Sequence, residues 1–326
     1  MSKKAASRLL SVIVVAALAA VALITNSNYL YNVFCQIACY FILCVGLNFI
    51  TGLTGQPMMG MAGVFALGSY TSAILTTKLD FSPWGAIPAV LLVGLLIGLL
   101  LGYPSLRIEG VYLSLTTIAF SEIVRILITN ATDLTGGGTG IKDIPNYSLF
   151  GYEFASSQSK FLLLLVFAIL IALLAVRIIN SRWGRSFIAI RDNIDAVPSC
   201  GINVTSIKLI AFILATMIGC LAGALYAHLF NYINPATYNQ TLSVNFVSML
   251  VIGGMGSIWG CLLGSAVVVY LPEILRFTGN FYDFTYAFIV LAFIVLMPGG
   301  LVSIFRKGKS KLKAGDIARI FVGGKK

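Results

Sequence analysis

Long apolar segments recur along almost the whole chain, separated by short polar stretches. A helix needs roughly 20 apolar residues to cross about 30 Å of hydrocarbon. The segments that approach or reach this length are 9–24, 30–50, 63–77, 86–102, 111–129, 161–179, 208–229, 241–256, 259–276 and 284–302. None shows the alternating pattern of about ten residues that is typical of transmembrane β-strands. The pattern therefore predicts an all-α, polytopic bundle of about ten transmembrane helices.

The first of these segments also has the basic start and apolar centre of a secretory signal peptide. The residues that follow it, 25–28, read Thr-Asn-Ser-Asn and lack the small-x-small site at which such peptides are cleaved. We therefore expect a retained first span. This predicts a short tail at 1–8, a membrane domain at 9–305 and a basic tail at 306–326.

The composition excludes an ordinary soluble domain. The chain is 59% hydrophobic and 10% charged, whereas soluble domains are near half apolar and about a quarter charged. The net charge of +11 would suit nucleic acid, but the Lys and Arg residues gather in the two tails and in the loop 180–207. This is the positive-inside pattern of cytoplasmic segments, which also suits contact with lipid headgroups. We expect both termini and this loop in the cytoplasm, the loop 130–160 on the opposite side, and no nucleic acid partner.

Glycines cluster in two places, at 52–68 and at 253–264. Small residues let helices approach closely, and this packing role alone would explain most of them. Pro57, within "GLTGQPMMGMAG", adds a helix-breaking residue at membrane depth. Broken or re-entrant segments are tolerated in a membrane only where protein or a cavity surrounds them, and they mark the pathway in many transporters.

The sequence contains no recognisable set of catalytic residues. The phosphate-binding loop, the nucleophile elbow and the H-E-x-x-H zinc motif are all absent from the sequence. The one histidine, His228, is expected to be a satisfied residue near the membrane interface. Cys35 and Cys39 share a helix face, but with no histidine near them we expect no metal. The sequence thus predicts a chain that is not an enzyme and holds no cofactor.

Two opposite charges lie inside an apolar segment. Glu122 and Arg125 are three residues apart, so they share a helix face and can form an ion pair. At the centre of a membrane each charge would cost roughly 2.5–3.5 kcal/mol on insertion scales, although both lie toward the outer end. Two interpretations stay open: a structural pair that fixes helix packing, or a contact with a zwitterionic substrate or a docking partner. No acidic residue lies at the midplane, where ion-coupled carriers place one, so we expect the energy source outside this chain.

The loop 180–207 carries its own pattern. Phe187, Ile190, Ile194 and Val197 are spaced as one stripe on a helix, and Pro198 then breaks the pattern. Asn203 or Thr205 is placed to cap the next span. The stripe predicts a short amphipathic helix. Such a helix either rests on the membrane surface or docks into a groove on a soluble partner.

The segment "DAVPSCG", Asp195–Gly201, is a weak match to the EAA-x-x-x-G loop of bacterial ABC importer permeases. Its context is more specific. In this order the chain contains "GLTGQPMMGMAGVFALGSYTSAIL", "GVYLSLTTIAFSEIVRILITNATDLTGGGTGI", "AIRDNIDAVPSCGINVTSIKLIAF", "LAGALYAH" and "VIGGMGSIWGCLLGSAVVVYLPEILR". Over about residues 35–306 the chain resembles branched-chain amino acid ABC transporter permeases of the LivM type.

The resemblance implies an importer subunit in the inner membrane of a bacterium, carrying leucine, isoleucine, valine or related small amino acids by alternating access. It implies a LivH-like permease partner, two ATPase subunits that bind ATP and Mg²⁺, and an extracytoplasmic substrate-binding protein. The residues it would place against the ATPase are Arg185, Arg191, Asp192, Asp195 and Gly201. The candidates for the pathway wall are Gly52, Gly55, Gln56, Gly60, Gly253, Gly254 and Gly256. The alternatives are a permease of the same superfamily for urea, an amide, a nucleoside or a sugar, a stand-alone carrier or channel, and, less favoured, a membrane enzyme.

Overall fold

The structure, a computed structural model, describes residues 28–106, 108, 110–149, 151–275, 282–297 and 299–303. The predicted first span, 9–24, and the two predicted tails lie outside these residues. Within them the chain is all-α apart from one two-stranded hairpin, β1 (Ser148–Leu149) and β2 (Tyr152–Glu153). The all-α class predicted from the hydrophobic pattern is therefore confirmed, whereas the predicted number of about ten spans is not shown by the described residues.

Each of the nine predicted spans from 30–50 onward coincides with a helix. The elements are α2 (Asn28–Leu47), η1 (Asn48–Leu53), α3 (Met61–Lys78), α4 (Pro83–Ser105), α5 (Val111–Asn130), α6 (Thr132–Thr135), η2 (Gly137–Thr139), α7 (Ser157–Ile179), α8 (Arg182–Asp192), η3 (Pro198–Cys200), α9 (Val204–Phe230), η4 (Pro235–Thr237), α10 (Gln240–Gly253), α11 (Ile258–Leu275) and α12 (Tyr282–Leu296).

Six of the helices that the structure describes are long and apolar enough to cross a membrane: 28–53, α4, α5, α7, α9 and α11. α3 has 18 residues but carries several Ser and Thr, and it lies deep in the bundle. α10 has 14 residues and α12 has 15, which is short of the roughly 20 that a full span needs. The chain is therefore a multi-pass membrane protein.

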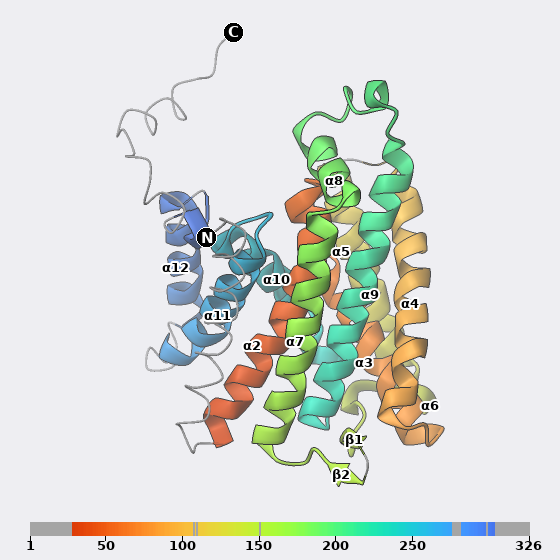
Figure 1. The fold of residues 1–326 in the computed structure, drawn as a ribbon. Helices are drawn as coiled ribbons and strands as arrows, with labels where there is room; N and C mark the ends of the chain where they lie inside the picture. Colours follow the sequence, from red (N-terminus) through yellow and green to blue (C-terminus); the bar gives the residue numbers. More distant parts are fainter. Residues whose placement is uncertain are drawn as a thin grey trace.

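The long helices run side by side, and the two polar loops lie at opposite ends of the bundle (Figure 1). α8 and the turns that lead to α9 form one end. The β1–β2 hairpin and α6 form the other. α9 is the centre of the packing, since it contacts α2, α3 and α4 along its length. This arrangement separates the loop 180–207 from the loop 130–160, as the charge pattern predicts.

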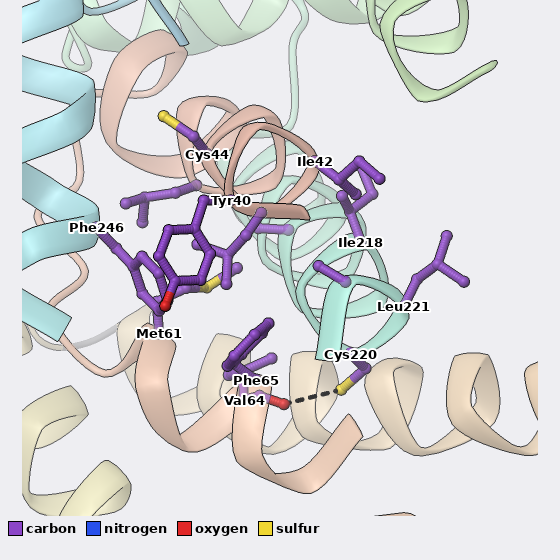
Figure 2. Close-up of a cluster of buried hydrophobic side chains, with 14 of the residues drawn as sticks. Tyr40, Ile42, Cys44, Met61, Val64, Phe65, Ile218, Cys220, Leu221 and Phe246 are labelled. Atoms are coloured by element: carbon purple, nitrogen blue, oxygen red, sulfur yellow. Dashed lines mark hydrogen bonds between the residues drawn. The ribbon is translucent and has the colours of Figure 1, made fainter. Parts of the chain in front are cut away.

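Small residues allow the close packing around α9. A Cβ atom on Gly68 of α3 would lie 2.1 Å from the carbonyl oxygen of Cys220 in α9, so only a glycine fits at this crossing. The thiol of Cys220 donates to the carbonyl of Val64 at 3.4 Å. Figure 2 shows this bond beside an aromatic cluster in which Phe246 of α10 has its ring 5.2 Å from Tyr40 and 5.6 Å from Phe65.

Hydrogen bonds fix the bundle at the end of α9 that lies near the hairpin. Asn231 follows α9 in the left-handed conformation, with φ of 57°, and its side-chain amide donates to the carbonyl of Ile144 at 2.6 Å. Lys160, in the first part of α7, donates to the Leu229 carbonyl at 2.9 Å and to the Asn231 side chain at 2.6 Å. A cation at a helix C-terminus is also favoured by the helix dipole.

His228 belongs to the same end of α9 and is satisfied, as predicted, although it is buried rather than interfacial. Its Nδ1 lies 2.6 Å from the Pro145 carbonyl, to which only an N–H can donate. Its Nε2 is then free to accept the hydroxyl hydrogen of Ser72, 2.8 Å away. Both bonds join α9 to other segments, so this histidine has a structural role.

Candidate functional site

The polypeptide after α2 leaves regular helical geometry inside the bundle. Residues Asn48–Leu53 continue α2 as one wide π-helical turn, and the chain from Thr54 to Gly60 is not helical. Pro57 has no N–H to give to a helical ladder, so it prevents a direct continuation into α3. The side chain of Thr54 closes the turn instead, since its hydroxyl donates to the Ile50 carbonyl at 2.6 Å. π-helical turns of this kind are frequent at functional sites.

The two glycine clusters of the sequence meet at this turn. The side-chain oxygen of Asn48 accepts a hydrogen bond from the backbone N–H of Gly256, 208 positions away, at 2.8 Å. A Cβ atom on Gly52 would lie 1.9 Å from that Asn48 oxygen and 2.8 Å from the Gly256 nitrogen. Gly52 and Gly256 are therefore neighbours, and the contact between them requires that position 52 has no side chain.

The second cluster forms the sharp turn between α10 and α11. Gly254 and Gly256 have φ of 118° and 79°, conformations that favour glycine. Gly253 packs against the carbonyl of Gly260, in the first turn of α11. Gly60 is not at this junction, because it contacts the Thr117 carbonyl of α5 instead. The structure thus brings Gly52 and Gly256 together, with Gly55 beside them under Arg191, whereas Gly60 lies elsewhere.

Arg191, in the last turn of α8, reaches into the same junction. Its Nη1 donates to the carbonyl of Gly52 at 2.9 Å, and the same nitrogen would lie 3.4 Å from a Cβ atom on Gly256. Its aliphatic part covers Gly55, which has φ of 73°. The side chain also pairs with Asp192 at 3.5 Å, but such partly exposed ion pairs contribute little to stability. Arg191 therefore ties α8 to the π-helical turn.

α8 contains the first half of the predicted stripe, Phe187 and Ile190, whereas Ile194 and Val197 lie beyond its end. Phe187, Ile190 and Val197 are buried, and the Phe187 ring packs on Phe49 of the π-helical turn, with centroids 6.3 Å apart. The helix ends at Asp192, where the side chain of Asn193 accepts from the backbone N–H groups of Asp195 and Ala196. This Asx turn takes the place of further helix.

The motif "DAVPSCG" is not helical in this chain. Pro198 opens the short 3₁₀ helix η3, and Gly201 follows it with φ of 72°. Asn203, one of the two predicted caps, accepts from the Ser206 N–H and starts α9. The residues predicted to face an ATPase, Arg185, Arg191, Asp192, Asp195 and Gly201, are all exposed. Asp195 and Gly201 belong to the segment that projects furthest at this end (Figure 1).

Gln56 is the most unusual of the pathway candidates. The residue is buried, with 8% of its surface exposed. Neither its side-chain nitrogen nor its side-chain oxygen has a hydrogen-bond partner among the described residues. A buried amide without a partner is costly, so its presence in the non-helical segment marks this place as one where a further polar group is expected.

Glu122 and Arg125 form the ion pair that their spacing predicts. Nε of Arg125 donates to both carboxylate oxygens of Glu122, at 3.0 and 3.1 Å, and Nη2 donates to one of them. The side chain of Glu122 is 43% exposed and that of Arg125 is 33% exposed. The pair lies on α5, whereas the junction around Gly52 is built from η1, α8 and the α10–α11 turn. The two sites are separate in the fold.

Sequence reasoning missed Asn48 and the hydrogen bond from Arg191 to Gly52. Asn48 is a polar residue within an otherwise apolar segment, and this was the only local signal for it. Its partner lies far away in the sequence, so the pattern near Asn48 carries no information about the contact. Arg191 lies off the apolar stripe and is exposed, as that position suggests. Its hydrogen bond to Gly52 is a long-range contact that the stripe does not specify.

The fold and this junction define a class of protein. A bundle of apolar helices of membrane-spanning length, interrupted by a glycine-rich segment and joined by an arginine to an amphipathic helix at one end, is a polytopic membrane protein. Among the described residues, no group of His, Cys, Asp and Glu is arranged to hold a metal ion.

Comparison with known proteins specifies the family. The family described as "Branched-chain amino acid transport system / permease component" matches residues 29–297. The high-affinity branched-chain amino acid transport system permease protein LivM of Salmonella typhimurium is 32% identical over 85% of this chain and 70% of its own length. The protein of the same name from Escherichia coli K12 is 33% identical over the same shares. More distantly, the autoinducer 2 import system permease protein LsrC of Yersinia pseudotuberculosis is 24% identical over 80% of this chain and 76% of its own length. No solved structure matches.

The chain belongs to the branched-chain amino acid transport permease family and is LivM-like. It is a permease component of an ABC transport system and, as such, a non-catalytic membrane subunit.

Proposed function

We propose that this chain, together with a second, LivH-like permease subunit, forms the pathway of an importer for leucine, isoleucine, valine or related small amino acids. The importer lies in the inner membrane of a bacterium, with both termini of this chain in the cytoplasm. The segment 9–24 adds a further span, for about ten in all, and the segment 54–60 is re-entrant. Two ATPase subunits bind ATP and Mg²⁺, and a binding protein delivers the amino acid from outside.

α8 and the turns that follow it act as the coupling element. The residues that contact the ATPase are the exposed Arg185, Asp192, Asp195 and Gly201. The motivation is their exposure on the side of the basic loop, which is the side that the positive-inside pattern assigns to the cytoplasm. Arg191 belongs to the same element but passes the movement inward.

The hydrogen bond from Arg191 to the Gly52 carbonyl is the observation that carries this proposal. A displacement of α8 would pull directly on the π-helical turn. The bond between Asn48 and Gly256 would then carry the displacement to the α10–α11 turn. Gly52, Gly55, Gln56, Gly253, Gly254 and Gly256 line or adjoin this moving wall, and Gly60 packs beside it on α5. Two alternative arrangements of the wall, open to one side or to the other, amount to alternating access.

The test is a replacement of residues 193–201 by a Gly/Ser linker of the same length, which leaves α8 and Arg191 intact. The two ATPases should co-purify with the native chain in detergent and be lost from the variant. Reconstituted with its partners, the native chain should show ATP-driven uptake of leucine, and the variant should show none. Association of the ATPases with both proteins alike would refute a coupling role for the loop. Absence of ATP-driven uptake by the native complex would refute the transport assignment.

A further inference from the structure

An ion pair lies on an exposed side of a membrane-spanning helix. Glu122 comes 11 residues after Val111, the first residue of the 20-residue helix α5, which at about 1.5 Å per residue puts it roughly 17 Å along the helix. It thus lies near the middle of α5 and not, as predicted from the sequence, toward the outer end. Arg125 follows one turn later. Both side chains are partly exposed, and both lie within the depth that about 30 Å of hydrocarbon would cover.

The two sides of α5 differ in kind. One side packs closely on α3, where Gly60 contacts Thr117 and Gly63 contacts Ser121. Arg125, one turn after the buried Ser121, lies at the edge of this packed side. Glu122 lies farther round the helix, near Leu115 and Ile126, which are 57% and 47% exposed. Hydrogen bonding within the described residues uses Nε and Nη2 of Arg125. Its Nη1 and part of the acceptor capacity of the carboxylate are left for other groups.

An exposed ion pair at this depth is not explained by lipid. Charged side chains in membrane-spanning segments face the interior of a bundle, a partner or a water-filled cavity, because contact with hydrocarbon is costly. The α3 side of α5 is already packed. The side that carries Glu122 and Arg125 must therefore face water or another chain.

We propose that Glu122 and Arg125 form a binding site on the pathway wall for the two charged groups of the transported amino acid. The site rests on the proposed function, in which a second permease subunit closes the pathway opposite α5. The substrate ammonium pairs with the Glu122 carboxylate, and the substrate carboxylate accepts hydrogen bonds from the Arg125 guanidinium. The branched apolar side chain packs on Leu115 and Ile126.

The charge pattern favours this occupant. A zwitterion presents one positive and one negative group close together, and the ion pair presents the complementary charges one helical turn apart. When no substrate is bound, the two side chains satisfy each other, so the empty site leaves no charge unpaired. A bound zwitterion would exchange one ion pair for two, at little electrostatic cost. The site would thus be weak, which suits a place that the substrate only passes.

The decisive experiment reverses the order of the charges. The double variant Glu122→Arg with Arg125→Glu keeps an ion pair between the same two helical positions, so a structural role is preserved. The comparison is the double variant Glu122→Asp with Arg125→Lys, which keeps the order of the charges. Each chain is reconstituted into proteoliposomes with its permease partner, the ATPases and the binding protein. Leucine uptake, complex assembly and ATP hydrolysis stimulated by the binding protein are then measured.

The reversed pair should lower leucine uptake by about tenfold or more, the effect of losing a charge-assisted contact, while assembly and stimulated ATP hydrolysis persist. The pair with conserved order should retain more uptake than the reversed pair. Uptake by the reversed pair equal to that of the native chain would overturn the site and leave a structural ion pair. Loss of the permease partner from the reversed variant would overturn it in favour of a subunit contact. Failure of the native complex to take up leucine would overturn the proposed function and this site with it.

Discussion

Arg191 and Gly52 are 139 positions apart, and a hydrogen bond of 2.9 Å joins the guanidinium of one to the backbone carbonyl of the other. The bond is the direct link between the amphipathic helix α8 and the broken segment after α2. Because the acceptor is the backbone carbonyl of residue 52, a substitution at that position would not remove it. Only the arginine can be altered to test the link.

Substitution of Arg191 should uncouple ATP hydrolysis from transport. Arg191→Gln shortens the side chain and removes the charge, so the bond to the Gly52 carbonyl is lost; a hydrogen bond from a charged group typically contributes about 1.5–3 kcal/mol. We expect the ATPases to stay bound and leucine uptake to fall by about tenfold or more. Uptake and ATP hydrolysis are measured together in proteoliposomes. Arg182→Gln, which removes a charge from the other end of α8, is the matched control and should keep both activities. Unchanged uptake in Arg191→Gln would contradict the link.

Charge reversal in the projecting loop should have a different outcome. Asp195 is exposed and follows the Asx turn of Asn193. Asp195→Arg is expected to weaken the binding of the ATPases themselves. If Asp195 faces a positive group of the ATPase, the arginine would put two positive charges together at the interface, which disfavours association. Co-purification of the ATPases should therefore be reduced, whereas in Arg191→Gln it should not. Equal co-purification in Asp195→Arg and the native chain would count against contact at this residue.

A methyl group at Gly52 should disrupt the junction. The added Cβ atom would lie 1.9 Å from the Asn48 side-chain oxygen, so Asn48 would have to release Gly256. We expect Gly52→Ala to destabilise the chain by about 1–3 kcal/mol, the usual cost of overpacking. The midpoint of thermal unfolding in detergent measures this. Gly138→Ala is the control, since no atom of the described part of the chain lies within 4 Å of the Cβ position there. A native midpoint for Gly52→Ala would show that the junction can relax.

Lys160 should stabilise the opposite end of the bundle. Its ammonium donates to the Leu229 carbonyl and to Asn231. Lys160→Met keeps most of the aliphatic chain and removes both bonds. We expect a loss of about 1–3 kcal/mol, because the carbonyl and the amide lose a charged partner. Lys142→Met, at an exposed position in the loop that precedes α7, should have little effect. Hydrogen exchange at the end of α9 provides the readout, and equal protection in the two variants would exclude the role assigned to Lys160.

The hydrophobic pattern was sufficient to place the helices, because burial in lipid or in the bundle imposes an apolar run whatever the partner. α3 illustrates the limit of that argument. Its Ser and Thr residues lower its hydropathy, and the structure buries it among other helices. The glycine clusters predicted a broken segment, and that segment was found at Thr54–Gly60.

The contacts that build the junction could not be predicted from the sequence. Asn48 with Gly256 and Arg191 with Gly52 are both long-range pairs, and no local periodicity specifies the far partner. Gly52 and Gly60 looked alike in the sequence, yet one packs at the junction and the other on α5. The Glu122–Arg125 pair was predictable because both partners lie on one helix.

The hydrogen bonds around Lys160 and Asn231 set the geometry of any movement that begins at α8. They hold α7, α9 and the loop that precedes α7 together at the end of the bundle opposite α8. A force applied at α8 therefore acts on α7 and α9 at the end opposite the one where they are held together. We expect these helices to tilt about the fixed end instead of sliding. A small displacement of α8 would then open the pathway at the α8 end far more than at the opposite end.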